Sequence, residues 1–409
     1  MGRVLGNSAF RRLAVSYGVN EFGDNFGLVA LAVLVFEETG SALATAALFV
    51  AAKFVPAGAA PWLTARLDRV APRLVLPALY VVESVVFAVL AWQATDFSLG
   101  IVLALAFLDG SLALTARALS RAVVAQTVGT TEALRDANAV LNVLFALTSA
   151  VGPALAGVVV ATGGASLALA LDAASFAVIA GLLAVTGGLP TGAVETHVPW
   201  AMRVRAGLAY VKGNPTVRTL VSAQASAFIF LFLVIPIEVV YAERTLHSGS
   251  EGFGALLASW GVGMIVGSAI YGRMRHARPV ILVGGSTFLV GLGYLGMAAA
   301  PGIVLACLAS ALGGVGNGVQ WVAVLTAVQE AVEHSFQARV VGLLESIGAA
   351  APGVGYLLGG VLTSVWSPRV AYLVAGLGVV AVAVTMTRRL ASGGGDARGR
   401  ELDRGQGVV

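Results

Sequence analysis

Long apolar stretches, separated by short polar breaks, run along almost the whole chain. A membrane-spanning helix needs about 20 mainly apolar residues, and stretches of this length recur throughout the sequence. They indicate helices, because a backbone in lipid must satisfy its own hydrogen bonds. We count twelve predicted spans, at residues 10–36, 41–64, 74–94, 98–122, 137–162, 166–188, 217–243, 251–272, 279–299, 301–326, 338–362 and 369–387.

Composition supports this interpretation. Of the 409 residues, 58% are hydrophobic and 11% are charged, whereas a soluble domain has about 25% charged residues. We therefore expect an all-α, multi-pass membrane protein in the lipid bilayer. The net charge of +4 is interpreted as a topology signal, so no nucleic-acid partner is expected. The single cysteine, Cys307, excludes an internal disulfide and a multi-cysteine metal site.

The distribution of basic residues predicts the orientation. With the N-terminus in the cytoplasm, only Lys53, Arg244 and Arg369 of the 25 basic residues fall outside the inner segments. Both termini are therefore expected to be cytoplasmic. The strong preference for Arg over Lys fits a GC-rich bacterial genome, so we expect a bacterial inner (cytoplasmic) membrane.

Polar breaks also divide the chain. The longest interior break, residues 190–215, predicts a cytoplasmic linker between an N-terminal bundle at 1–189 and a C-terminal bundle at 216–390. Residues 200–212 within it are expected to form a short amphipathic helix on the membrane surface. The Gly-rich, charged tail at 391–409 is expected to be disordered.

The two halves resemble each other in sequence. Residues 10–13 have a counterpart about 206 positions later at 217–220, and the small residues of 152–157 recur about 203 positions later at 355–360. Two like-oriented halves of six spans form a parallel repeat, with a substrate site expected near the midplane between them.

Several short stretches carry a resemblance to a known family. They are Leu67-Asp68-Arg69-Val70-Ala71-Pro72-Arg73 after the second span, Gly152-Pro153-Ala154-Leu155-Ala156-Gly157 in the fifth, Leu134-Arg135-Asp136-Ala137-Asn138, Leu171-Asp172-Ala173-Ala174-Ser175-Phe176 and Phe22-Gly23-Asp24. Together they resemble the major facilitator superfamily over nearly the full length of the chain. The fifth span is similar to the Gly-Pro-x-x-Gly-Gly motif of drug:proton antiporters, with Ala156 in a Gly position. The combination resembles the macrolide-efflux-like branch, which also contains siderophore exporters.

The resemblance implies twelve helices in two six-helix bundles and a secondary active transporter. Its expected activity is export of an amphipathic small molecule (a drug, antibiotic or secondary metabolite) in exchange for protons, by alternating access. It also implies that Asp68, Arg69 and Arg73 form a conformational latch, against the alternative of simple membrane-surface charge. By the same resemblance, the antiporter motif consists of Gly152, Pro153 and Gly157.

Charged residues inside the predicted spans are the strongest candidates for function, because each costs about 2.5–3.5 kcal/mol to insert at a helix centre. Asp24 precedes Thr39 by nearly the same number of positions as Lys53 follows it, which places both about 21–23 Å from the turn. We therefore expect an Asp24–Lys53 ion pair, with Glu21 one helical turn away. Such a group either exchanges protons with the medium or joins the first two helices as a static lock.

Other polar residues in the spans are less decisive. Asp109 in the fourth span is a further candidate for proton or cation coupling, and Glu83 a neighbour in a structural network. Arg117 and Arg121 are expected to anchor the inner leaflet or to pair with Asp136. Asp172 is expected to lie near the outer end of the sixth span, where it caps local structure. Polar residues that are candidates for the substrate cavity are Asn20, Asn142, Gln224, Asn317, Gln320 and Glu345.

Aromatic residues offer a second type of cavity wall. Those that could stack on an apolar drug, or equally pack against other helices or lipid, are Phe228, Phe230, Phe232, Trp260 and Trp321.

Nothing in the sequence predicts an enzyme. A phosphate-binding Gly-Lys-Ser/Thr motif is absent, and the four histidines do not have metal-ligand spacing. We expect no cofactor, a monomer, and a small-molecule substrate and protons as partners. The alternatives are a siderophore exporter or uptake facilitator of the same fold, and a non-transporting lipid-handling or receptor-like membrane protein.

Overall fold

The computed structural model describes residues 2–67, 70–128, 131–185, 208–274, 277, 279–332 and 334–405, and within these ranges it contains helices and no strand. The first elements along the chain are α1 (Gly2–Leu5), α2 (Ser8–Thr39), α3 (Ala42–Phe49), the π-helix η1 (Val50–Phe54), α4 (Val55–Leu67), α5 (Pro72–Gln93), α6 (Leu99–Val128) and α7 (Thr131–Val185).

The remaining elements follow after residue 208. They are α9 (Pro215–Val234), the 3-10 helix η2 (Ile235–Ile237), α10 (Glu238–Val240), the π-helix η3 (Tyr241–Thr245), α11 (Gly249–Arg273), α12 (Pro279–Ala299), α13 (Ile303–Ala331), α14 (His334–Val365) and α15 (Pro368–Gly405).

Ten helices in the described part of the chain are long and apolar enough to cross a membrane, so this is a multi-pass membrane protein. One of the ten, Asp136–Ala184, has a break at Gly164, whose backbone is non-helical with φ 78°. The break falls between the spans predicted at 137–162 and 166–188. A shorter apolar helix covers Ala350–Val365. The all-helical fold is confirmed, whereas the number twelve stays a prediction.

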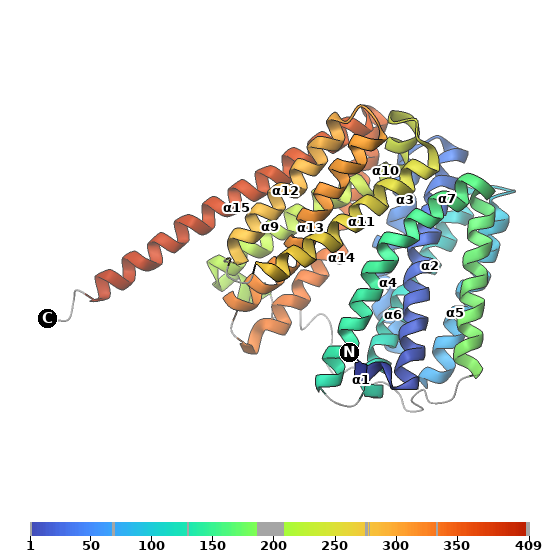
Figure 1. The fold of residues 1–409 in the computed structure, drawn as a ribbon, viewed down its shortest axis with the longest axis horizontal. Coiled ribbons are helices and arrows are strands. Elements are labelled where there is room, and N and C mark those ends of the chain that lie inside the picture. The colour runs from blue at the N-terminus through green and yellow to red at the C-terminus, as the bar shows by residue number, and fades with distance from the viewer. Residues whose placement is uncertain are drawn as a thin grey trace. The chain divides into compact units, whose positions relative to one another are not determined.

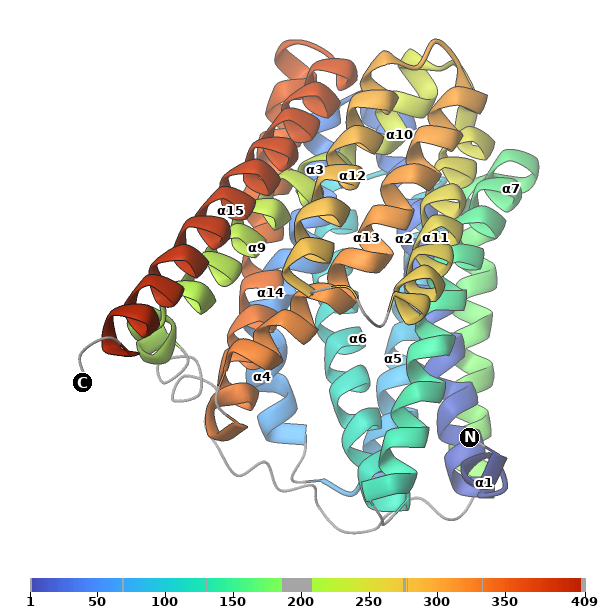
Figure 2. The same cartoon turned by 60° about the vertical axis from the view of Figure 1, so that its left-hand side comes forward.

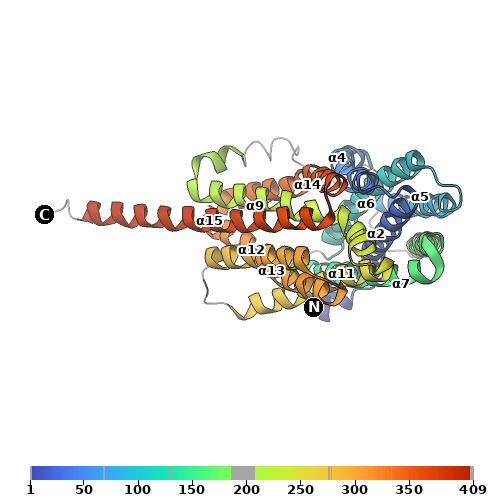
Figure 3. The ribbon, with the colours of Figure 1, turned by 90° about the horizontal axis from the view of Figure 1, so that it is seen from above.

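The chain divides into two compact units. Unit 1 consists of Met1–His197, Ile235–Gly261 and Tyr356–Pro368, and unit 2 of Val198–Val234, Val262–Gly355 and Arg369–Val409. Within unit 1, α2 and α5 each pack along α7 (Figure 1). Within unit 2, α12 and α13 lie side by side, and Figure 2 and Figure 3 show this pair from two further directions.

Local signals fix the ends of α2, the helix that carries most of the candidate charges. The Asn7 side chain caps its N-terminus by accepting hydrogen bonds from the backbone N–H groups of Ala9 at 3.0 Å and Phe10 at 3.2 Å. Gly40 ends the helix in the left-handed conformation with φ 60°. Ser41 then caps α3 by accepting from the N–H of Ala44. The predicted turn near Thr39 is therefore present.

Small residues allow helices of unit 1 to touch through their backbones. A Cβ at Gly157 of α7 would lie 2.7 Å from the Ser250 carbonyl oxygen and 2.9 Å from the Gly254 Cα of α11. A Cβ at Gly110 of α6 would collide with the carbonyl oxygen of Ala52 in η1. Glycines at these positions permit close approach, as they do in other membrane helices.

The structure describes only the last part of the predicted linker, but most of the predicted tail. Of residues 190–215, the structure describes 208–215, and residues 208–213 are helical; the rest of the predicted linker and surface helix lies outside the described residues. At the other end, α15 continues as a helix to Gly405. This differs from the disorder predicted from residue 391. A helix that has already nucleated gains one backbone hydrogen bond for each residue it adds.

Candidate functional site

One face of α2 carries four polar residues in the interior of unit 1. Tyr17, Asn20, Glu21 and Asp24 have the spacing of one helix face, and all four are buried, with Glu21 fully inaccessible. Asn20 Nδ2 lies 3.5 Å from Asp24 Oδ2. An ionised side chain in such surroundings is costly unless another group compensates its charge.

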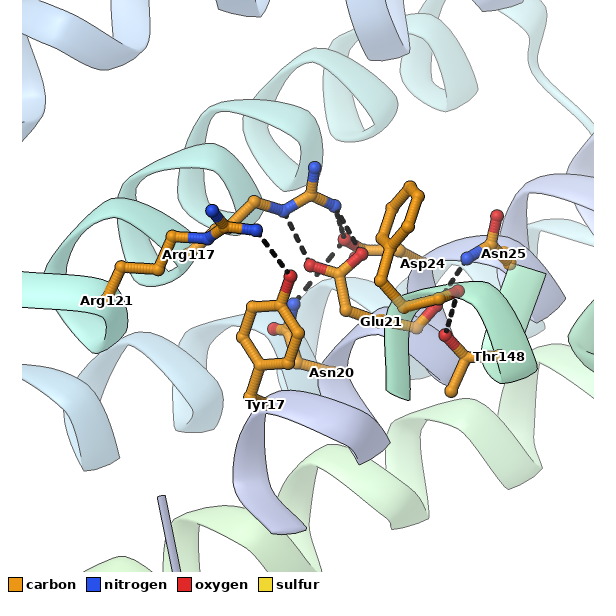
Figure 4. Close-up of polar contacts among 9 residues, drawn as sticks. Tyr17, Asn20, Glu21, Asp24, Asn25, Arg117, Arg121 and Thr148 are labelled. Atoms are coloured by element: carbon orange, nitrogen blue, oxygen red, sulfur yellow. Dashed lines mark hydrogen bonds and ion pairs between the residues drawn. The ribbon is translucent and has the colours of Figure 1, made fainter. Parts of the chain in front are cut away.

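Arg117 of α6 supplies that compensation. Its Nε lies 2.6 Å from Glu21 Oε1, and its Nη2 donates a hydrogen bond to Glu21 Oε2 at 2.6 Å. The same Nη2 lies 3.5 Å from Asp24 Oδ2. Figure 4 shows the guanidinium facing both carboxylates. The Nη2 hydrogen bond to Glu21 Oε2 is charge-assisted, while Nε and Oε1 form a close ion pair and no hydrogen bond. Asp24, one helical turn away, contacts the same Nη2.

Arg121 extends the group by one turn of α6. Its Nη2 donates to the hydroxyl oxygen of Tyr17 at 3.2 Å, and its guanidinium carbon lies 5.8 Å from the centre of the Tyr17 ring (Figure 4). The two arginines therefore bind α2. These contacts with α2 were not predicted from the sequence, and the inner-leaflet anchoring of Arg117 and Arg121 or their pairing with Asp136 stays a prediction.

The expected Asp24–Lys53 ion pair is wrong. In the described part of the chain, Arg117 is the cation within ion-pair distance of Asp24. Lys53 instead interacts electrostatically with Glu21 and Asp109. Lys53 lies in the π-helix η1, whose wider turn rotates the side chains relative to the ideal helix that a residue count assumes. Such π segments are frequent at functional sites.

The sequence contained a signal for Arg117. The separation along the chain between Glu21 and Thr39, at the end of α2, equals that between Leu99, where α6 begins, and Arg117. Both side chains are therefore about 27 Å along their helices from the same side of the bundle. The depth comparison that pointed to Lys53 would have identified Arg117 if it had been applied to the fourth span.

Two further acids are buried in the interior of unit 1. Glu83 of α5 is fully buried, and Asp172 of α7 is 2% exposed. Asp172 touches the backbone of α2, because a Cβ at Gly23 or at Gly27 would collide with its carboxylate oxygens. The proposed cap near the outer end is therefore not its role in this structure. Glu83 lies within electrostatic range of Asp109, and its place in a structural network stays a prediction.

The polar candidates of unit 2 are partly enclosed. Gln320 Nε2 donates to Thr287 Oγ1 at 3.1 Å and lies 3.5 Å from Gln224 Oε1. All three side chains are buried, so this network joins α9, α12 and α13. Asn317 is half-buried, with its Nδ2 3.6 Å from Met264 Sδ.

The remaining cavity candidates do not join these groups. Asn142 is exposed on α7, in unit 1. Glu345 lies in α14, and its side chain is outside the described part of the structure.

Aromatic residues of unit 2 form one contiguous group. The ring centres of Phe228 and Phe232 are 5.7 Å apart, and those of Phe228 and Trp321 are 6.2 Å apart. Trp321 is 46% exposed while Phe228 is buried. The group therefore has an exposed indole side chain, Trp321, packed against the buried ring of Phe228.

The motifs singled out by resemblance are only partly visible. Asp68 and Arg69 lie outside the described residues, and Arg73 is exposed in the first turn of α5. Gly152, Pro153 and Gly157 are buried in α7, where Gly157 makes the close contact with α11. Among the described residues, no group of three or more His, Cys, Asp or Glu side chains is arranged to hold a metal ion.

Comparison with known proteins agrees with this architecture. Residues 220–403 match the family model of the Major Facilitator Superfamily. No curated protein matched the sequence. Among solved structures, the nucleoside transporter NupG is similar with a TM-score of 0.67 and 13% identity, covering 94% of this chain and 99% of that one.

Two other transporters have similar folds. A bacterial homolog of the human lysosomal transporter Spinster, in an inward-facing and occupied conformation, gives a TM-score of 0.69 at 14% identity, covering 94% of this chain and 95% of that one. A POT family transporter in complex with a thioalcohol-conjugated peptide gives a TM-score of 0.69 at 11% identity, covering 92% of this chain and 95% of that one. These likenesses show the fold of major facilitator transporters and, with the family model, support the superfamily.

Proposed function

We propose that the chain is a proton-coupled secondary transporter that exports an amphipathic small molecule by alternating access. The single observation that carries the proposal is the Arg117 guanidinium shared by two buried carboxylates, Glu21 and Asp24, inside a membrane-spanning bundle. Charged groups in such positions are costly to keep and commonly mark substrate, ion or proton pathways.

The geometry gives the two carboxylates different roles. Glu21 holds Arg117 with both oxygens at 2.6 Å, so it is the firm partner. Asp24 contacts the same cation at 3.5 Å. Glu21 Oε1 and Asp24 Oδ1 both make no hydrogen bond among the described residues, so the distance to Arg117 is what distinguishes the two carboxylates. When a proton binds Asp24, Arg117 remains compensated by Glu21. Asp24 is therefore the proposed proton-exchanging residue, and Glu21 the residue that keeps Arg117 in place.

Lys53 and Asp109 extend this coupling site. Lys53 interacts electrostatically with both Glu21 and Asp109, and the close contact between Gly110 and Ala52 brings α6 and η1 together beside them. A proton or substrate charge arriving at one carboxylate therefore changes the field at the others.

The substrate class rests on the resemblance to drug exporters and on the aromatic group of Phe228, Phe232 and Trp321, which suits an apolar or aromatic molecule. Siderophore export, facilitated uptake, and a non-transporting lipid-handling or receptor-like role are the competing functions. Export in a bacterial cytoplasmic membrane by a monomer completes the proposal.

A susceptibility and accumulation panel with amphipathic antibiotics and dyes, including a macrolide and ethidium, tests the activity in cells. Cells that make the intact chain should accumulate at least one probe less than cells with Asp24→Asn. Asp96→Asn is the matched control, because Asp96 is exposed in the connection between α5 and α6. Increased accumulation with the intact chain would instead indicate uptake. Equal accumulation of every probe with all three chains would contradict export of this substrate class.

A further inference from the structure

A second group of carboxyls lies at the junction of α2, α5 and α7, apart from the Arg117 ion pairs. Glu83 is fully buried, and within the described part of the chain neither of its carboxylate oxygens has a hydrogen-bond partner. Asp172 is 2% exposed, and its Oδ2 is likewise without a partner among these residues. A buried polar group without a partner requires a physical explanation, since nearly all such groups in native proteins are satisfied.

The helix packing places these two residues at the same level. Ser84 Oγ donates a hydrogen bond to the Ala173 carbonyl oxygen at 2.8 Å, and Ser84 and Ala173 directly follow Glu83 and Asp172 in the chain. Glu83 lies nearly three helical turns before Gln93, where α5 ends, and Asp172 just over two turns after the break at Gly164. Both are thus about 12–15 Å along their helices, near the middle of a hydrocarbon layer of about 30 Å.

Aromatic rings and glycines surround the two carboxyls at the junction of α2, α5 and α7. Phe87 and Phe176 each follow one of the two acids by one helical turn along the chain, and their ring centres are 5.4 Å apart. Gly23 and Gly27 of α2 lie against the Asp172 carboxylate and against these two rings. Ser175 Oγ, 3.3 Å from Asp172 Oδ1, is the hydroxyl in hydrogen-bond contact with this carboxylate. The two carboxyls are therefore enclosed by protein, where charges are screened much less than at the surface.

The charged groups that face Glu83 from the packed helices are acidic. They are Asp24 of α2, Asp109 of α6 and Asp172 of α7, with Tyr80 on the same helix. The nearby cations Arg117 and Lys53 are engaged elsewhere, since Arg117 binds Glu21 and Asp24, and Lys53 interacts with Glu21 and Asp109. Ionising all of several neighbouring buried carboxyls is unfavourable, because like charges repel and burial disfavours the charged form.

We propose that Glu83 and Asp172 form a second proton-binding site, which holds at least one proton and exchanges it with Asp24. In the exchange an O–H bond breaks at Glu83 or Asp172 and another forms at the Asp24 carboxylate, so one negative charge moves in the opposite direction. Asp24 is the link because it interacts electrostatically with both acids and also contacts Arg117. This inference deepens the proposed proton coupling and rests on it for its physiological role.

Infrared spectroscopy of the purified chain tests the site without any substrate. A buried protonated carboxyl has a carbonyl stretch distinct from that of a carboxylate. The intact chain at neutral pH should show this band, and Glu83→Gln and Asp172→Asn should each reduce or remove it. Asp96→Asn is the control for loss of an exposed carboxyl. It should leave the band unchanged.

Either of two outcomes would contradict the proposed proton-binding site. One is that the intact chain lacks the band at neutral pH, and the other is that the band persists in both Glu83→Gln and Asp172→Asn. Thermal unfolding in detergent identifies any variant that does not fold. If Glu83→Gln does not fold, Glu83→Asp replaces it in the test, and because this variant keeps a carboxyl it should retain the band. A chain that has the band yet moves no protons with substrate contradicts the proposed transport function and leaves the proton site standing.

Discussion

Each ionisable side chain in the interior of unit 1 must offset the loss of its contacts with water. Glu21 does so with two contacts of 2.6 Å to Arg117, while Asp24 has one of 3.5 Å to the same cation. The Glu83 carboxylate has no hydrogen-bond partner among the residues that the structure describes. The residues thus form a series from firmly paired to unpaired, and the loosely paired Asp24 stands between the two extremes. This position is what makes Asp24 suited to exchange a proton.

Replacing Arg117 by Ala should destabilise the protein strongly. Removing one partner of a buried ion pair typically costs about 3–5 kcal/mol, because the remaining charge is left uncompensated. Arg117→Lys should recover only part of this loss, since an ammonium lacks the planar fork that matches both Glu21 oxygens. Thermal unfolding in detergent measures the effect, with Arg73→Ala at an exposed site as the control. Equal midpoints for Arg117→Ala and Arg73→Ala would contradict the buried pair.

At the scale of helices, glycines determine which helices pack closely and therefore which acidic side chains become neighbours. The carboxylate of Asp172 reaches α2 only because Gly23 and Gly27 lack side chains there. Similarly, Gly110 lets η1 approach α6 beside Lys53 and Asp109. These close approaches replace hydrophobic burial as the reason for helix association, since lipid is as apolar as the helix surfaces.

Gly27→Ala should therefore destabilise unit 1. The added methyl group would collide with Asp172 Oδ2 and with the ring of Phe87, and overpacking of this kind costs about 1–3 kcal/mol. The matched control is Gly58→Ala on α4, where a Cβ would meet nothing within 4 Å. This substitution should stabilise the protein by up to about 1 kcal/mol, because Ala has a higher helix propensity than Gly. Thermal unfolding of both variants gives the comparison. A Gly27→Ala chain as stable as Gly58→Ala would mean that α2 and α7 are not packed this closely.

The sequence indicated which charges lie inside helices but not their direction around the helix. Counting residues placed Asp24 well inside its span, and in the structure its side chain is buried within unit 1. The partner was wrong, because a count assumes ideal helices and η1 is a π-helix. The proximity of Glu83 to Asp172 could not be predicted from the sequence, since it depends on how α5 and α7 rotate onto α2. The helical fold was predictable because lipid leaves the backbone few alternatives.

For the whole molecule, the distribution of basic residues predicts that both termini are cytoplasmic. In a Cys307→Ser background, which removes the single cysteine, Asp96→Cys should react with a membrane-impermeant maleimide added to intact cells. Arg73→Cys, on the opposite end of α5, should react only after the membrane is permeabilised. The opposite labelling pattern would place both termini outside the cytoplasm.

The whole protein is proposed to work as a proton-driven exporter, and one measurement tests this most directly. A probe identified in the accumulation panel is loaded into proteoliposomes that contain the intact chain, Asp24→Asn or Asp96→Asn, and its movement is followed after a pH gradient is imposed. The intact chain and Asp96→Asn should drive the probe against its concentration gradient, whereas Asp24→Asn should allow only movement down that gradient. Uphill transport by Asp24→Asn at the rate of the intact chain would contradict the assignment of proton coupling to the Arg117 site.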